Sequence, residues 1–155
     1  MLRASPYPTM ATIVRNILAV VIGLMAGGLV NMGLVMLGPK IFPPPAGANL
    51  STPEGLQAAM PLLGPEHFVF PFLAHALNAF VGALVVYLMA ASRRTQLPWI
   101  VGGLTLIGGI AAALMIPAPL WFEALDIIVA YLPMTCLAIK VGQRLKPETP
   151  AAPAA

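Results

Sequence analysis

The sequence predicts an all-α integral membrane protein, folded as a bundle of four transmembrane helices. Hydrophobic residues make up 59% of the 155 positions and charged residues only 8%, against about 25% charged residues in a typical soluble domain. Mean hydropathy is +0.91. Several apolar runs have about the 20 residues that cross the hydrocarbon core of a bilayer. We expect these spans at about 11–38, 68–91, 98–116 and 120–141.

A single membrane domain, residues 11–146, is expected between two disordered ends. Residues 1–10 hold prolines without periodicity, and Met10 is an alternative translation start. Residues 147–155, rich in proline and alanine, have the composition of a disordered tail. The first apolar run is longer than the 7–15-residue core of a signal peptide, so we expect it to remain as a span.

The longest connection, residues 39–67, is predicted to contain a short interfacial helix from about Thr52 to Met60. Its start has a hydroxyl cap within Ser51-Thr52, a proline in the first turn and Glu54 placed for a capping box. We expect this helix to lie across the outer mouth of the bundle. In the fourth span, Pro133 removes a backbone donor and is expected to kink the helix.

The basic residues predict orientation. By the positive-inside rule, both termini are cytoplasmic, the long loop is outside, and the location is a bacterial inner membrane. The net charge of +3 does not indicate nucleic-acid binding, because its basic residues are scattered at span ends and form no patch. Lys40 alone lies on the outer side, opposite Arg15, Arg93, Arg94, Lys140, Arg144 and Lys146.

Small residues recur along the spans at helical spacing and predict close helix–helix packing. A glycine removes the side chain that would keep two helices apart, so these positions are candidate contacts between spans. The predicted packing glycines are Gly23, Gly27, Gly82, Gly102 and Gly109.

The fourth apolar run carries two carboxylates, Glu123 and Asp126. Each costs about 2.5–3.5 kcal/mol at the centre of a membrane helix. Their three-residue separation places both on one helix face. We therefore expect this face to turn inward and to meet polar groups of other spans.

Depth identifies those groups. Asn31, His75 and Asp126 each lie about seven residues, or ~10 Å, below the outer end of their span. Glu123 lies about a turn shallower and Asn78 about a turn deeper. These five residues form the predicted buried polar cluster. We expect a hydrogen bond or ion pair between His75 and Asp126, with both asparagines satisfying the remaining polar atoms.

This cluster is compatible with three kinds of protein. The first is a non-enzymatic accessory or scaffold subunit, in which the cluster joins helices; the second is a small channel or proton-coupled carrier that uses His75, Glu123 and Asp126. The third is a membrane-embedded enzyme with a metal or cofactor, since these three side chains form a nitrogen and oxygen donor set suited to zinc or iron.

The sequence itself contains no ExxH pair, HExxH, CxxC, GxSxG or Walker loop, and Cys136 is the single cysteine. We therefore predict no catalytic residue, metal ligand or cofactor. The expected partners are the lipid bilayer and either further copies of the chain or a larger membrane complex.

Overall fold

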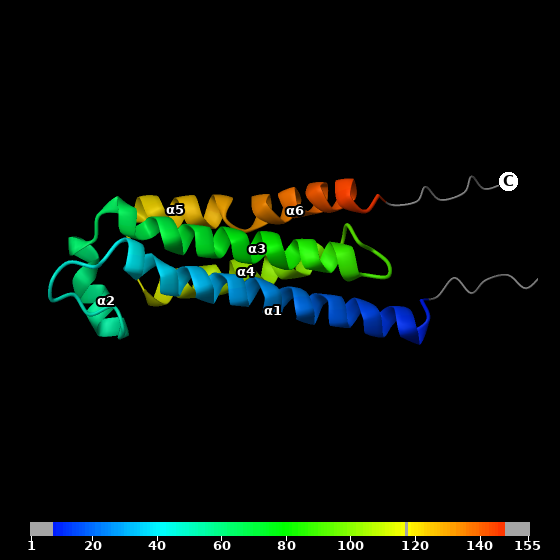
Figure 1. Ribbon diagram of the computed structural model, residues 1–155, viewed down its shortest axis with the longest axis horizontal. Helices are drawn as coiled ribbons and strands as arrows, with labels where there is room; N and C mark the ends of the chain where they lie inside the picture. The colour runs from blue at the N-terminus through cyan, green and yellow to red at the C-terminus, as the bar shows by residue number, and fades with distance from the viewer. Residues whose placement is uncertain (1–7, 117, 148–155) are drawn as a thin grey trace, which may run out of the picture.

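The computed structural model describes residues 8–116 and 118–147, and over these residues the chain is helical with no strand (Figure 1). The predicted all-α class is confirmed, while most of the predicted lead and tail lies outside the described residues. The elements are α1 Met10–Ile41, α2 Pro53–Ala59, η1 Met60–Leu62, η2 Pro65–Phe68, α3 Val69–Met89, α4 Pro98–Met115, α5 Leu120–Val129 and α6 Leu132–Leu145.

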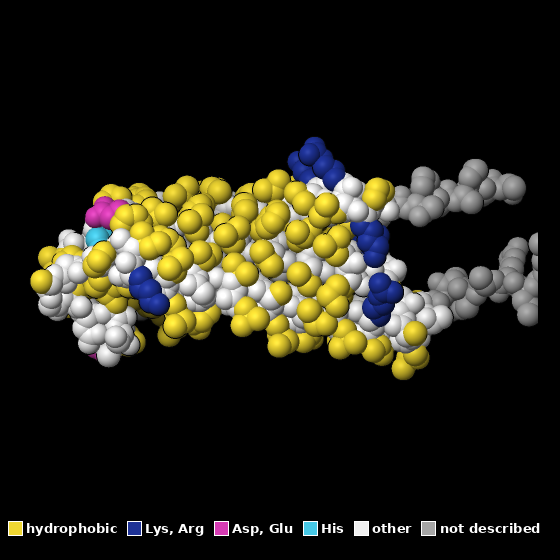
Figure 2. Space-filling view, in the orientation of Figure 1, with side chains coloured by type: hydrophobic (Ala, Val, Ile, Leu, Met, Phe, Trp, Pro, Cys, Tyr) yellow, Lys and Arg dark blue, Asp and Glu magenta, His cyan; other side chains and the backbone are white. Residues whose placement is uncertain are grey.

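Four helical stretches are long and apolar enough to cross a membrane: Met10–Ile41, Pro65–Met89, Pro98–Met115 and Leu120–Leu145. They confirm the four predicted spans and shift their ends by a few residues. Figure 2 shows a broad hydrophobic surface over the visible face of the bundle, with lysine and arginine side chains toward its two ends. Such a surface fits contact with lipid, so this is a multi-pass membrane protein.

The third helix, α3, is the centre of the bundle, because it contacts α1, α4, α5 and α6. Its contact with α1 is close. A Cβ atom added at Gly23 would lie 2.7 Å from the carbonyl oxygen of Gly82, and one added at Gly27 would lie 2.5 Å from that of Asn78. Only glycine allows the two backbones to approach this far.

The predicted packing glycines of α4 also face neighbouring helices. A Cβ at Gly102 would collide with Thr135 of α6, and one at Gly109 would collide with the ring of Tyr131. Gly82 is shared, since its position lies against both α1 and Val101 of α4. All five predicted glycines thus lie where two elements meet.

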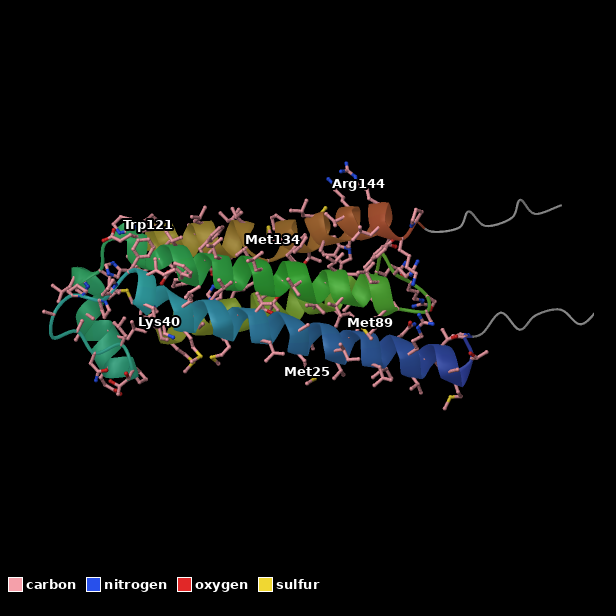
Figure 3. All side chains as sticks on the ribbon, in the orientation of Figure 1. Met25, Lys40, Met89, Trp121, Met134 and Arg144 are labelled. Atoms are coloured by element: carbon pink, nitrogen blue, oxygen red, sulfur yellow. The ribbon has the colours of Figure 1, made fainter. Side chains whose placement is uncertain are left out.

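Polar side chains cap the C-terminal end of α3 at the end of the bundle where α1 begins and α6 ends. Arg15 Nε donates to the carbonyl oxygen of Met89 at 2.9 Å, and Lys146 Nζ donates to that of Leu88 at 3.1 Å. Figure 3 shows Met89 and Arg144 at this end, opposite Lys40 and Trp121. These donors satisfy carbonyls that a helix end leaves without partners.

The predicted short helix between the first two spans is present as α2, but its start differs from the prediction. Its N-cap is Thr52, whose hydroxyl accepts from the amide of Gly55 at 3.1 Å. Glu54 is then the second helical residue, one position too early for a capping box. The amide of Ser51 instead donates to Asn49 Oδ1 at 2.9 Å, which starts the turn that precedes the cap.

The fourth span is broken where the sequence predicted a kink. Helix α5 ends at Val129, helix α6 begins at Leu132, and Ala130 and Tyr131 form a turn between them. Pro133 is the second residue of α6, where its missing amide hydrogen leaves no hydrogen bond unmade in the first turn. The proline therefore serves as a helix start, and the two halves can point their side chains independently.

Candidate functional site

His75 of α3 and Asp126 of α5 meet in the half of the bundle that carries α2, the half that the sequence predicts to be the outer one and that is called outer here. Nδ1 of His75 lies 2.8 Å from Oδ2 of Asp126, with 28% of the His75 side chain and 7% of the Asp126 side chain exposed. A carboxylate only accepts hydrogen bonds, so the His75 nitrogen carries the proton and donates. The structure thus brings together the two residues for which depth along the spans predicted a contact.

Tyr131 is the second donor to the same carboxylate oxygen, and sequence reasoning missed it. Its hydroxyl donates to Asp126 Oδ2 at 2.9 Å, and its ring stacks on that of His75 at 5.8 Å between centroids. In a continuous helix, two residues five positions apart are turned by about 140° from each other. The break after Val129 turns the Tyr131 hydroxyl toward Asp126. No local sequence pattern predicts this geometry.

The two asparagines do not take the predicted role. Within the described residues, neither Asn31 nor Asn78 makes a side-chain hydrogen bond, although both are partly buried. The side chain of Asn78 lies against α1 at Gly27. The second oxygen of Asp126, Oδ1, is buried and has no partner among these residues. The prediction that asparagines complete this site was therefore wrong.

Glu123 lies one turn closer to the outer end of α5 and caps its own turn. Its Oε1 accepts from the amide of Ala118 at 2.9 Å. A carboxylate in the first turn of a helix is also favoured by the positive end of the helix dipole. Glu123 is therefore partly satisfied by backbone and is not bonded to His75 or Asp126.

Beside these residues lies a cavity of about 350 Å³ at the outer end of the bundle. The carboxylates Glu123 and Asp126 and the two histidines of the chain contribute polar groups to a wall that is otherwise mostly apolar. Every span takes part, and so does the connection between the first two. The lining residues are Val35, Gly38, Pro39, Phe42, Leu50, Leu56, Met60, Leu63, His67, Phe68, Phe70, Pro71, His75, Gly109, Ala112, Ala113, Ile116, Ala118, Phe122, Glu123, Asp126 and Ile127.

The outer connection closes one side of this cavity. Leu56 of α2 and Met60 of η1 belong to its wall, and α2 lies at the outer end of the bundle in Figure 1. His67 lies between two parts of the connection, with Nδ1 3.2 Å from the carbonyl oxygen of Gly64 and Nε2 3.2 Å from that of Pro43. The neutral ring has one N–H, so it donates to one of these carbonyls and packs against the other. One ring thereby joins η2 to the segment that leaves α1.

The opposite half of the bundle is filled by side chains. Ala19 of α1, Val86 and Tyr87 of α3 and Val101 of α4 have no exposed surface. A shallow groove of about 720 Å³ runs outside this half, along α1 and α4, and its lining is apolar apart from a few residues such as Arg93. The outer cavity is the candidate site, because it alone of the two contains paired ionisable groups.

The donor set for a metal ion is not assembled. Among residues 8–116 and 118–147, no three His, Cys, Asp or Glu side chains gather closely enough to hold one. Glu123 accepts a hydrogen bond from the Ala118 amide. Asp126 accepts hydrogen bonds from both His75 and Tyr131. What this arrangement offers chemically is a polar end to an apolar cavity.

No family model, curated protein or solved structure matches this chain.

Proposed function

We propose that this chain is a non-enzymatic membrane protein that binds a small amphipathic molecule in its outer cavity, as an accessory component of the membrane. The observation that supports this proposal is the cavity itself, about 350 Å³ of mostly apolar space with the hydrogen-bonded group His75–Asp126–Tyr131 on one side. A concave apolar site with a few convergent polar groups is the usual form of a small-molecule site.

Retention of a ligand fits the packing better than an open pore does. Beyond the cavity, Gly23 and Gly82 lie in contact across α1 and α3, and Gly142 of α6 lies against the ring of Tyr87. Side chains with no exposed surface fill the same half of the bundle. A molecule that enters the cavity therefore meets a closed floor, and binding is the simplest event that this geometry supports.

A cavity-filling variant tests this proposal. Ala113 lines the cavity, whereas Ala111, two residues earlier on α4, is exposed and does not. Ala113→Phe should abolish the saturable binding of the neutral amphipathic dye N-phenylnaphthylamine to the purified full chain in a neutral detergent. Ala111→Phe, the matched control, should bind the dye as the unaltered protein does. Equal binding by both variants, or no saturable binding by the unaltered protein, would exclude the cavity as the site.

A second candidate function is a proton-coupled carrier. The observation that favours it is the chain of hydrogen bonds from His75 through Asp126 to Tyr131, inside a membrane-spanning region where ionisable groups commonly take part in function. Asp126→Asn distinguishes the two functions in proteoliposomes. A carrier should lose pH-dependent solute flux, whereas a binding subunit shows no such flux with either residue.

The orientation that we propose places both termini in the cytoplasm of a bacterium and the cavity in the outer half of its inner membrane. The asymmetry of basic side chains supports it, with Arg15, Arg93 and Arg94 at one end and Lys40 at the other. In a Cys136→Ala background, Asn49→Cys should react with a membrane-impermeant maleimide in spheroplasts, and Gln143→Cys should react only after lysis. The opposite pattern would reverse the orientation.

Association with further copies or with a larger membrane complex is part of the same proposal. A bundle this small buries little surface of its own, and one face of α1 presents Met25, Leu29 and Met32 outward. Cross-linking in native membranes should give products larger than the monomer. Recovery of the monomer alone would remove this part of the proposal.

A further inference from the structure

We propose that the outer cavity selects an organic cation, a protonated amine attached to an apolar body. This inference rests on the proposed function, since it names the chemical class of the molecule bound there. It is drawn from the charges of the lining residues, from polar atoms that lack a donor and from the aromatic rings that surround them.

The ionisable groups of the cavity wall carry a negative formal charge. Glu123 and Asp126 are carboxylates, His67 and His75 are neutral by the usual convention, and the lining residues include no lysine or arginine. Lys40, near the outer end of α1, is exposed and is not among them. An anionic ligand would meet two like charges here, whereas a cation would meet two opposite charges in a setting that water screens weakly.

Among the described residues that line the cavity, the side-chain polar atoms left without a protein partner are acceptors. Oδ1 of Asp126 is buried and has no donor among the described residues. His75 uses Nδ1 to donate to Asp126, so Nε2 of its neutral form offers a lone pair. Glu123 accepts the Ala118 amide through one oxygen only. A protonated primary amine has three N–H donors and no acceptor, which complements such a set.

Aromatic rings line the same space. Phe68 and Phe122 have ring centroids 4.9 Å apart, and Phe42 and Phe70 have theirs 6.1 Å apart. All four belong to the cavity wall. The face of an aromatic ring attracts a cation, more strongly where water is excluded, and the ring also accommodates an apolar body. Carboxylates and phenylalanines together therefore favour an amphipathic cation over a neutral or anionic molecule of the same size.

Three probes with one apolar body test the inference: phenylbutylamine, phenylbutanol and phenylbutyrate. Binding is measured on the purified full chain in a neutral detergent at about pH 8, where an amine is charged and a free imidazole is neutral. Trp99→Phe leaves Trp121 as the single tryptophan. Trp121 contacts Phe68 and Phe122, at 5.6 and 5.9 Å between ring centroids, so its fluorescence reports on the cavity wall.

We expect the amine to bind at least about tenfold more tightly than the alcohol, and the carboxylate to show no saturable binding. Asp126→Asn should weaken amine binding about tenfold or more and change alcohol binding by less than about threefold. Glu123→Gln, whose amide oxygen can still accept from Ala118, should weaken amine binding as well. Glu54→Gln makes the same chemical change on the exposed side of α2 and should bind all probes as the unaltered protein does.

Two outcomes separate this inference from the proposed function. Equal binding of the three probes, or unchanged amine binding in both the Asp126 and Glu123 variants, overturns the cation selectivity and leaves a ligand-binding cavity. Absence of saturable binding for every probe overturns both proposals. If Asp126→Asn does not fold, as judged by circular dichroism and gel filtration, the comparison of Glu123→Gln with Glu54→Gln decides the matter alone.

Discussion

Alanine at Gly27 should destabilise the bundle by about 1–3 kcal/mol, whereas alanine at the neighbouring Gly28 should leave it unchanged or slightly more stable. A methyl group at Gly27 would lie 2.5 Å from the carbonyl oxygen of Asn78, while ordinary contacts begin at 3.4 Å. The two helices α1 and α3 would have to separate locally by the difference, about 0.9 Å. A gap of this size forfeits about a quarter to a half of the dispersion attraction at each contact that it opens.

Gly28 is the control that the chain itself provides. Nothing lies within 4 Å of the position that its methyl group would take, and the residue is exposed. Alanine there gains up to about 1 kcal/mol of helix propensity without touching α3. Thermal and denaturant unfolding in a neutral detergent, followed by circular dichroism, measures both variants. If Gly27→Ala unfolds like the unaltered protein, or Gly28→Ala loses as much stability, α1 does not meet α3 along the face described.

Three further substitutions test the site and the outer connection. Gly109→Ala should lower the melting temperature and weaken dye binding, because its methyl group would displace the Tyr131 hydroxyl from Asp126, whereas Gly108→Ala, with nothing within 4 Å, should change neither. Equal behaviour of the two variants would contradict the packing of Tyr131 on α4. Tyr131→Phe keeps the ring but removes a donor to a buried carboxylate, so it should cost about 1–3 kcal/mol of unfolding free energy, and no loss would mean that this hydrogen bond is absent. Thr52→Ala should cost about 1 kcal/mol locally, seen as faster amide exchange in α2 alone, and exchange unchanged in α2 would argue against this cap.

The sequence predicted the spans and the meeting of His75 with Asp126 for a simple physical reason. Rise per residue fixes depth along a membrane helix, and buried carboxylates must find donors at their own depth. Depth does not fix how far each helix is rotated about its axis. Asn31 and Asn78 have suitable depths, yet neither makes a side-chain hydrogen bond in the part of the chain that the structure describes.

Two other features depended on backbone geometry that residue spacing does not encode. Pro133 indicated an interruption of the fourth span, because proline has no amide hydrogen to donate to the preceding turn. Either a kink or a complete break of the helix can accommodate the proline. Only the break allows Tyr131 to reach Asp126. Glu123 has the depth for the cluster and is instead held by the amide of Ala118, since a nearby backbone donor competes effectively with more distant side chains.

The two cations that end α3 have a consequence for experiments on membrane topology. Arg15 of α1 and Lys146, which follows α6, donate hydrogen bonds to the last two carbonyl oxygens of this helix. Both residues are far from α3 in the sequence. Charge-reversal mutagenesis, which is used to invert the orientation of a membrane protein, would in this molecule also remove hydrogen bonds to α3, the helix that contacts every other span. Under the orientation that we propose, the same two side chains contribute both to the insertion signal and to the end of α3, so any change of orientation must be measured together with folding.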